Sequence, residues 1–264
     1  MKPTFSTQSR PLIAGMILRD DPDSIIFAVK NSIRDGADCL GIQLEYLKKE
    51  YKSEEIYKKI FAACSGLPIY ITNYRGKENN GCSDREISDE LLMALSCGAT
   101  LADVPASWFD SDSEMGIGLE LSMKQSAIDK QMHLIDKIHQ MGKEALMSSH
   151  VLRFISAETV LEIACEQQRR GADVVKIVTA ANSDEEQMEN LRITTLLKKE
   201  LKVPFLFLSS GTHSKIHRMI GPQLGCAAYL AVKEHDERAI ITQPTIRAAK
   251  AVRDHLDLWS DSAV

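Results

Sequence analysis

One lysine lies inside an otherwise apolar run. Lys176 is the fourth residue of Asp-Val-Val-Lys-Ile-Val at positions 173–178. Side chains alternate between the two faces of a strand, so if Val175 and Ile177 face covering helices, Lys176 faces the opposite side. Burial disfavours a charged amine, and a neutral amine attacks carbonyl carbons. We therefore predict that Lys176 forms a Schiff base; the alternatives are a lysine on an edge strand or one paired with an acid such as Asp173.

A histidine ends the apolar run that precedes the lysine. His150 closes Met-Ser-Ser-His at 147–150. Consecutive parallel strands are often neighbours, so the two side chains can meet at the same edge. A neutral imidazole is well suited to moving protons near pH 7. We predict that His150 is the proton-transfer partner of Lys176; the alternative is a structural histidine.

Further polar residues follow other strand-like runs. Arg218 lies after the seventh run, where a guanidinium can grip a carboxylate or phosphate with two hydrogen bonds, unless it is a solvated helix residue. Ser209 and Ser210 end that run and are candidate substrate contacts. Asp103 ends the fourth run, where a carboxylate can orient a base or the substrate.

The third run ends in a polar stretch that favours turns. Tyr74, Arg75 and Glu78 lie in Asn-Tyr-Arg-Gly-Lys-Glu-Asn-Asn-Gly at 73–81. We predict that these three side chains contact the substrate; an ordinary surface loop is the alternative.

The elements that must position these residues alternate regularly. Strand-like runs occupy 11–18, 39–45, 68–74, 100–106, 144–151, 173–180, 204–210 and 226–232. Helical patterns lie between them, as at 124–141 and at 184–201, where Ser183 is the expected N-cap. Eight βα units predict a parallel sheet closed into a (β/α)₈ TIM barrel, a single domain over 1–264. An open doubly wound sheet is the alternative, but it usually has a glycine-rich loop after its first strand, where this chain has Arg-Asp-Asp-Pro at 19–22.

Composition narrows the class of protein. The net charge of −5 argues against nucleic acid or an anionic membrane as partner. No window approaches 18 consecutive apolar residues, and residues 1–10 carry no apolar signal region, so a cytoplasmic location is expected. The six cysteines form no C-x-x-C pair and no metal-ligand cluster is recognisable, so neither a metal nor another cofactor is expected.

In these motifs the chain resembles the type I 3-dehydroquinate dehydratase family over nearly its whole length. The most specific points are Ser-x-His at 148–150 and the lysine within 173–177; Lys-Glu at 77–78, Asp103 and Ile-His-Arg at 216–218 also fit. The resemblance implies that Lys176 forms the imine, that His150 is the general acid/base and that Arg218 grips the substrate carboxylate. It also implies the reaction: 3-dehydroquinate becomes 3-dehydroshikimate plus water. Glu78 and Asp103 match acidic positions near the family's site.

The chain departs from the family pattern where the family binds the hydroxyls and carboxylate of dehydroquinate. A Glu-x-Arg-x-Asp signature aligns with Gly-Ile-Gln-Leu-Glu at 41–45, so Gln43 takes the place of the arginine. Tyr74 stands at the strand-three arginine, with Arg75 one residue late. In the strand-eight loop Asp236 replaces a serine and is expected to repel a carboxylate, while Gln243 replaces the missing glutamine if the loop is shifted.

These departures leave other readings open. The lysine and histidine also suit a related Schiff-base lyase or a class I aldolase that acts on a different small hydroxy-ketone or aldehyde, and a binding barrel without catalysis is a third class. The expected partner in each case is a small carbonyl compound, anionic if Arg218 binds it. The resemblance implies a homodimer, for which apolar residues near Trp108, Phe109 and Ile117 offer an interface or a lid.

Overall fold

Eight parallel strands form the centre of the molecule. The computed structural model describes residue 5 and residues 10–256. The strands are β1 (Leu12–Ile17), β2 (Cys39–Gln43), β3 (Ile69–Thr72), β4 (Leu101–Pro105), β5 (Glu144–His150), β6 (Val174–Ala180), β7 (Phe205–Ser210) and β8 (Ala228–Ala231). Each falls inside one of the eight runs predicted from sequence.

The strands pair in the order β7-β6-β5-β4-β3-β2-β1-β8. The two ends of this order meet as well, because the Ala227 amide donates a hydrogen bond of 2.8 Å to the Phe205 carbonyl. The predicted closed (β/α)₈ barrel is therefore confirmed, and the open doubly wound alternative is wrong.

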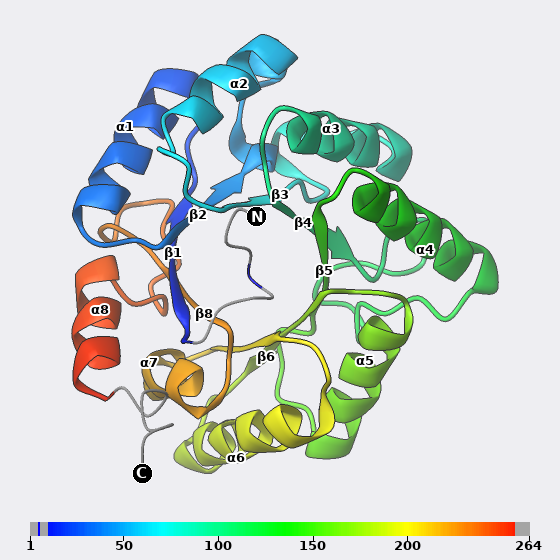
Figure 1. The fold of residues 1–264 in the computed structure, drawn as a ribbon. Helices are drawn as coiled ribbons and strands as arrows, with labels where there is room; N and C mark the ends of the chain where they lie inside the picture. The colour runs from blue at the N-terminus through cyan, green and yellow to red at the C-terminus, as the bar shows by residue number, and fades with distance from the viewer. Residues whose placement is uncertain (1–4, 6–9, 257–264) are drawn as a thin grey trace.

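A ring of helices surrounds the strands (Figure 1). They are α1 (Pro22–Arg34), α2 (Glu54–Ala62), α3 (Asp84–Ser96), α4 (Gln125–Gln140), α5 (Ala157–Arg169), α6 (Asp184–Glu200), α7 (Lys215–Leu224) and α8 (Ile246–His255). Polar caps fix where several of them begin. Ser183 accepts a hydrogen bond from the Glu186 amide at the start of α6, as predicted, and Ser83 and Glu86 form a reciprocal capping box at the start of α3.

Strand β6 shows how the core directs the lysine. Val175 and Ile177 belong to a buried cluster that includes residues of α5 and α6. Val174 and Val178 belong instead to the cluster inside the barrel. Because side chains alternate along the strand, Lys176 points into the barrel, as the sequence predicted.

The segment between β4 and α4 contains no helix and runs across the carboxyl end of the barrel through residues 106–124. Trp108 is buried there, so the prediction that it offers an exposed apolar surface is wrong; Ile117 is exposed. Two residues of this segment, Phe109 and Glu120, have positive φ angles, a conformation that side-chain-bearing residues adopt only when their surroundings hold them in it.

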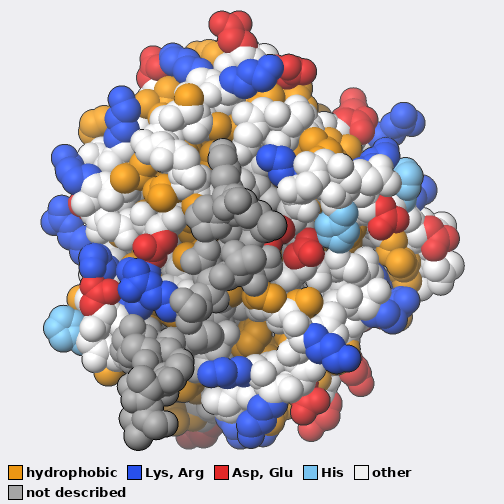
Figure 2. All heavy atoms as spheres, viewed as in Figure 1, with side chains coloured by type: hydrophobic (Ala, Val, Ile, Leu, Met, Phe, Trp, Pro, Cys, Tyr) orange, Lys and Arg blue, Asp and Glu red, His pale blue; other side chains and the backbone are white. Residues whose placement is uncertain are grey.

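Charged side chains of both signs are interspersed around the face seen in Figure 2, as expected for a chain with a small net charge. Within the described ranges, none of the helices has the length and apolar character needed to cross a membrane.

Candidate active site

A cavity of about 380 Å³ opens at the carboxyl ends of the strands. Its wall includes Lys176 of β6 and His150 at the end of β5, so the two residues expected to do the chemistry share one space. The remaining lining residues come from all eight strands or the segments that follow them: Met16, Gln43, Glu45, Tyr46, Thr72, Tyr74, Arg75, Lys77, Met115, Leu152, Val178, Leu208, Ser210, Arg218, Leu230, Ile240 and Gln243. Active sites of (β/α)₈ barrels lie at this end.

The Lys176 side chain is 5% exposed and all three of its donors are engaged. Nζ donates to the Tyr74 hydroxyl at 2.6 Å, to Asp103 Oδ2 at 2.9 Å and to the Tyr70 hydroxyl at 3.1 Å. This is the environment of an ammonium ion paired with a carboxylate. The acid considered from sequence, Asp173, bonds elsewhere, to His139 and to the Ala145 amide.

The carboxyl group that pairs with the lysine lies beneath the cavity. Burial alone would raise the pKa of Asp103, but the charge of Lys176, the imidazole of His150 and hydrogen bonds from Ser148 and Tyr70 together lower it. Ser148 and Tyr70 each donate to the carboxylate at 2.5 Å. Asp103 is thus held ionised and orients the lysine, and it lies behind the residues that line the cavity.

Tyr74 contacts both Lys176 and His150. Its hydroxyl accepts from Lys176 and donates to Asp103 Oδ2 at 2.6 Å, while its ring packs edge-on against His150 with centroids 5.1 Å apart. Burial, followed by the negative charge of Asp103, raises the pKa of Tyr74 well above its ordinary value, so the phenol stays protonated. The predicted site residue Tyr74 therefore lies between the lysine and the histidine.

His150 is held by a residue that sequence reasoning missed. Its Nδ1 lies 2.9 Å from Glu120 Oε2, and its backbone amide donates to the same carboxylate. Glu120 is buried, accepts from Ser107 Oγ at 3.2 Å, and uses its own carbonyl to accept from Ser149 Oγ at 3.1 Å. A carboxylate at Nδ1 fixes the ring orientation and leaves Nε2 for chemistry.

Arg75 anchors the segment that carries Glu120. Its guanidinium forms two hydrogen bonds with Asp84, at 2.7 and 2.6 Å, and donates to the carbonyl of Ser113 at 2.7 Å. Asp84 in turn accepts from the Phe109 amide. Arg75 lines the cavity, as expected for a substrate contact, but its described hydrogen bonds go to Asp84 and to the carbonyls of the loop.

Two other predicted contacts lie away from the cavity. Glu78 lies in the short 3₁₀ turn Lys77–Asn79 and is not part of the cavity wall, which takes Lys77 instead. Ser209 faces α6 and accepts from Asn190 at 2.8 Å, while the next residue, Ser210, lines the cavity. Strand alternation explains the difference between Ser209 and Ser210, because only one of two consecutive residues in a strand can face inward.

Arg218 is a buried cation that lines the cavity without an acidic partner in the described part of the chain. Its one described hydrogen bond runs from Nε to the Ser209 carbonyl at 2.5 Å. Burial lowers its pKa to about 10, so the group remains charged at neutral pH at a cost in free energy. A buried unpaired guanidinium facing a cavity is suited to binding an anion.

Two carboxamides complete the polar wall. Gln243 is buried, and its Oε1 has no hydrogen-bond partner among the described residues. Gln43, at the end of β2, also lines the cavity, and its side chain has no described partner. Both were predicted site residues, and the structure brings them to the same space as Arg218.

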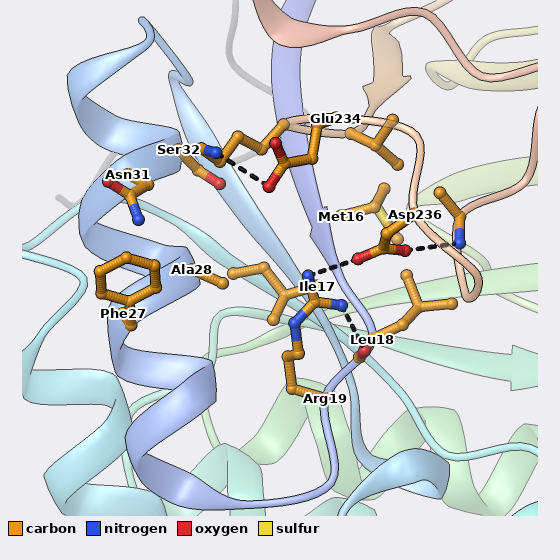
Figure 3. Close-up of a pocket in the computed structure, with 13 residues that line it drawn as sticks. Met16, Ile17, Leu18, Arg19, Phe27, Ala28, Asn31, Ser32, Glu234 and Asp236 are labelled. Carbon is orange, nitrogen blue, oxygen red and sulfur yellow. Dashed lines mark hydrogen bonds and ion pairs between the residues drawn. The ribbon is translucent and has the colours of Figure 1, made fainter.

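Asp236 does not face this cavity. It lines a smaller hollow, whose volume is about 60 Å³. Figure 3 shows its carboxylate directed at Arg19 from the loop after β1. The ion pair is 2.6 Å long, and Oδ1 accepts from the amides of Arg238 and Ala239 at 3.0 Å. The expectation that Asp236 repels a substrate carboxylate is therefore wrong, because Arg19 neutralises it outside the site.

One acid remains in the cavity wall. Glu45 is buried, and its carboxylate accepts from Thr72 Oγ1 at 2.9 and 3.1 Å. Burial raises its pKa to about 7. Because no cation is paired with it in the described residues, Glu45 changes charge near neutral pH.

Comparisons with known proteins assign the chain to a family. A family model described as type I 3-dehydroquinase matches residues 16–258. The bifunctional 3-dehydroquinate dehydratase/shikimate dehydrogenase of Arabidopsis thaliana is 26% identical over 254 residues, which cover 94% of this chain and 37% of that protein. The chain thus spans about a third of that relative's length. The 3-dehydroquinate dehydratase of Aromatoleum aromaticum is 20% identical over 229 residues, covering 84% of this chain and 82% of that protein.

Solved structures show the same fold. The 3-dehydroquinate dehydratase of Geobacillus kaustophilus has a TM-score of 0.79 at 17% identity, covering 98% of this chain and all of that chain. The type I enzyme of Clostridium difficile, solved with covalently modified comenic acid, has a TM-score of 0.77 at 17% identity, covering 95% of this chain and 94% of that one.

Proposed function

Because the chain belongs to the type I 3-dehydroquinase family, we propose that it is a Schiff-base lyase that removes water from a cyclic hydroxy-ketone acid, with 3-dehydroquinate as the first candidate. The observation that supports this most directly is the buried amine of Lys176 in a cavity wall shared with His150. A related lyase or aldolase that uses the same pair on another carbonyl compound is the second candidate, because Gly41 and Gln43 replace two of the family's binding residues.

Imine formation begins with release of a proton from the Lys176 ammonium. Asp103 lies 2.9 Å from Nζ and can take that proton directly or through Tyr74. The neutral amine then attacks the ketone carbon, and the carbinolamine hydroxyl leaves as water with the proton that Asp103 took, which gives the protonated imine and restores the carboxylate. The buried carboxylate also stabilises the protonated imine, since this cation replaces the ammonium in the same pair.

Elimination then depends on His150. The protonated imine draws electrons from the adjacent carbon, whose proton passes to Nε2 of the imidazole. The resulting enamine expels the hydroxyl group one carbon further along, and the imidazolium returns its proton to the departing oxygen. Glu120 at Nδ1 stabilises the imidazolium between these two steps. Hydrolysis of the conjugated imine frees the product and restores Lys176.

Arg218 orients the substrate in this scheme. A carboxylate on the substrate would accept from the guanidinium, which has no acidic partner among the described residues. Holding the carboxylate at one side of the cavity places the ketone toward Lys176 at the other. We further propose a homodimer in the cytoplasm, which light scattering on the purified chain and localisation of the expressed protein would test.

Trapping with borohydride tests the proposed function. Incubation with 3-dehydroquinate and sodium borohydride should give a secondary amine on Lys176, located by mass spectrometry of the digested protein, and turnover should yield a conjugated enone detected by its ultraviolet absorption. Lys176→Ala should abolish both. The matched control, Lys199→Ala on the exposed end of α6, should retain both.

Loss of the lysine also leaves Asp103 buried without its cation, at a cost of roughly 3–5 kcal/mol in stability. The double variant Lys176→Met/Asp103→Asn removes both charges and keeps the fold testable by circular dichroism. Turnover by either folded variant at the wild-type rate would exclude the imine mechanism. A barrel that binds without catalysis would show binding by calorimetry but no adduct in the wild type.

A further inference from the structure

We propose that the site is built for an oxo acid with a single carboxylate and a largely apolar body, rather than for a ring that carries several hydroxyl groups. This rests on the proposed function, because it takes Lys176 as the group that meets the ketone and Arg218 as the group that meets the carboxylate. It adds the chemical character of the part of the substrate that lies between its ketone and its carboxylate.

The part of the wall from β6 round to β1 is apolar. Val178 of β6, Leu208 of β7, Leu230 of β8 and Met16 of β1 all line the cavity and belong to the same buried cluster. Each is only 5–7% exposed. They therefore form a continuous hydrocarbon surface, which we call the apolar floor, on neighbouring strands beside Lys176.

Met16 also fills a place where a polar side chain would otherwise project. Residue 41 is glycine, and a Cβ built there would lie 2.2 Å from Met16 Sδ and 2.8 Å from its Cε. The methionine thioether occupies the volume that a side chain on β2 would use. The start of the β2 wall thus adds apolar surface in place of a hydrogen-bonding group.

Most polar groups in the wall are already satisfied by the protein. Glu45 and Thr72 bond to each other, Tyr74 bonds to Asp103 and Lys176, and Ser210 donates to the Thr179 carbonyl at 2.8 Å.

Besides Lys176 and His150, the groups in the described wall left to hydrogen-bond a ligand are therefore few. Arg218 is the buried cation without an acidic partner among the described residues, and the carboxamides of Gln43 and Gln243 are neutral. The exposed Lys77 and the Tyr46 ring below it also line the wall. One buried cation fits one carboxylate, and the apolar floor itself offers no partner for a set of hydroxyl groups.

The rim of the cavity also carries large apolar side chains. Met115, Leu152 and Ile240 line its outer part from three different loops and are 43%, 47% and 47% exposed. Exposed apolar side chains gathered at a cavity mouth are characteristic of a surface that contacts an apolar ligand.

The energetic consequence is selection against hydroxyl groups. A hydroxyl placed on the apolar floor gives up its hydrogen bonds to water and receives none in return, whereas a methylene in the same place gains by leaving water. One such unpaired hydroxyl weakens binding by about tenfold or more.

Two ketone acids with the same skeleton test this. 3-Oxocyclohexane-1-carboxylate has the ring, carboxylate and ketone positions of 3-dehydroquinate but none of its hydroxyls. Wild-type protein is trapped with each by borohydride over a range of concentrations, and the Lys176 adduct is quantified, with each ketone normalised to its reaction with Nα-acetyllysine. We expect half-maximal trapping at about tenfold lower concentration for the unhydroxylated acid.

Variants of the apolar floor give an internal check. Val178→Thr keeps the branched shape and adds a hydroxyl, and Leu208→Asn replaces a hydrocarbon group by an amide of similar size. In both variants the ratio of the two concentrations that give half-maximal trapping should fall by about threefold or more. Met188→Asn, on the exposed face of α6, should leave the preference unchanged.

The outcomes separate this inference from the proposed function. Trapping of both acids on Lys176 with a preference for 3-dehydroquinate would overturn the inference and leave the Schiff-base function standing. A preference for the unhydroxylated acid that neither floor variant alters would also overturn it, because the floor would not be its source. No adduct with either acid would overturn the proposed function and the inference with it.

Discussion

The two sides of the barrel mouth are built in opposite ways. On the β3–β6 side, the polar atoms around Lys176 are satisfied by the protein itself, through Asp103, Tyr70, Tyr74 and, for the histidine, Glu120. On the β7–β8 side, Arg218 has no acidic partner among the described residues and Oε1 of Gln243 has no hydrogen bond there. The first arrangement keeps side chains in fixed positions, and the second leaves buried polarity to be satisfied by a ligand.

The two sides of the barrel mouth should therefore respond differently to mutation. A satisfied buried network rigidifies its members, so a change there should disturb both fold and chemistry. An unsatisfied buried charge reduces the stability of the free protein, so its removal should reduce binding but not stability. Four substitutions measure how far the contrast holds.

His150→Ala is expected to have the largest effect of the four. Turnover should fall about 10²–10⁴-fold because the imidazole that moves the proton is removed, while imine trapping on Lys176 survives. Steady-state rates and borohydride trapping on the same sample measure the two effects. His133→Ala on α4, which is exposed, is the control. Unchanged turnover would remove His150 from the mechanism.

Arg218→Met tests the unsatisfied side. The change keeps much of the volume and removes the charge, so KM should rise about 10²–10³-fold while the melting temperature at pH 7 does not fall. Arg85→Met, at an exposed position of α3, should alter neither quantity. A clear loss of thermal stability with KM unaffected would make Arg218 a structural residue and reverse the contrast.

Glu45→Gln tests the one acid of the wall that has no cation. Its folded pKa is raised from 4.5 to about 7, so the folded state favours the protonated form. The stability from this group is therefore complete below pH 4.5 and is lost as the pH rises through 7, which amounts to about 3 kcal/mol.

The glutamine variant has no such loss. Relative to wild type, its free energy of unfolding in urea should be higher at pH 8 than at pH 5 by nearly that amount. Glu55→Gln, at an exposed position of α2, is the control and should show no pH-dependent difference. An equal difference between Glu45→Gln and wild type at both pH values would show that Glu45 does not titrate in this range.

Glu120→Gln should have the smallest effect. Glutamine can still hydrogen-bond His150 Nδ1 but no longer offers a charge to the imidazolium, so kcat should fall about tenfold with KM nearly constant. The single-turnover rate of imine formation should be unchanged. Glu114→Gln, exposed on the same loop, serves as the control. A rise in KM with constant kcat would mean that Glu120 shapes the binding site instead of positioning the base.

The parts of the site that follow from local periodicity were predictable. Alternation along β6 was enough to point Lys176 into the barrel, and strand order placed His150 beside it. The same rule distinguishes Ser209, which faces α6, from Ser210, which faces the cavity, although the residue type alone makes both candidates.

Contacts between distant segments were not predictable in this way. Glu120 lies in a stretch without periodicity and has a positive φ, so no pattern linked it to a residue 30 positions away. Arg19 neutralises Asp236 across 217 residues, which reversed the expected repulsion. Arg75 is a predicted substrate contact because it lies in the polar stretch after the third run, but its pairing with Asp84 depends on how distant segments fold together.

The close approach of Met16 to residue 41 also constrains how this sequence can change. Any side chain introduced at 41 displaces the thioether of Met16, and Met16 lines the substrate cavity. A glutamate introduced at position 41 alone would push the Met16 side chain toward the space that the substrate needs. An acidic side chain at 41 is therefore compatible with an open cavity only if residue 16 has first been replaced by a smaller one. The order of the two mutations, and not only their identity, then decides whether activity is retained.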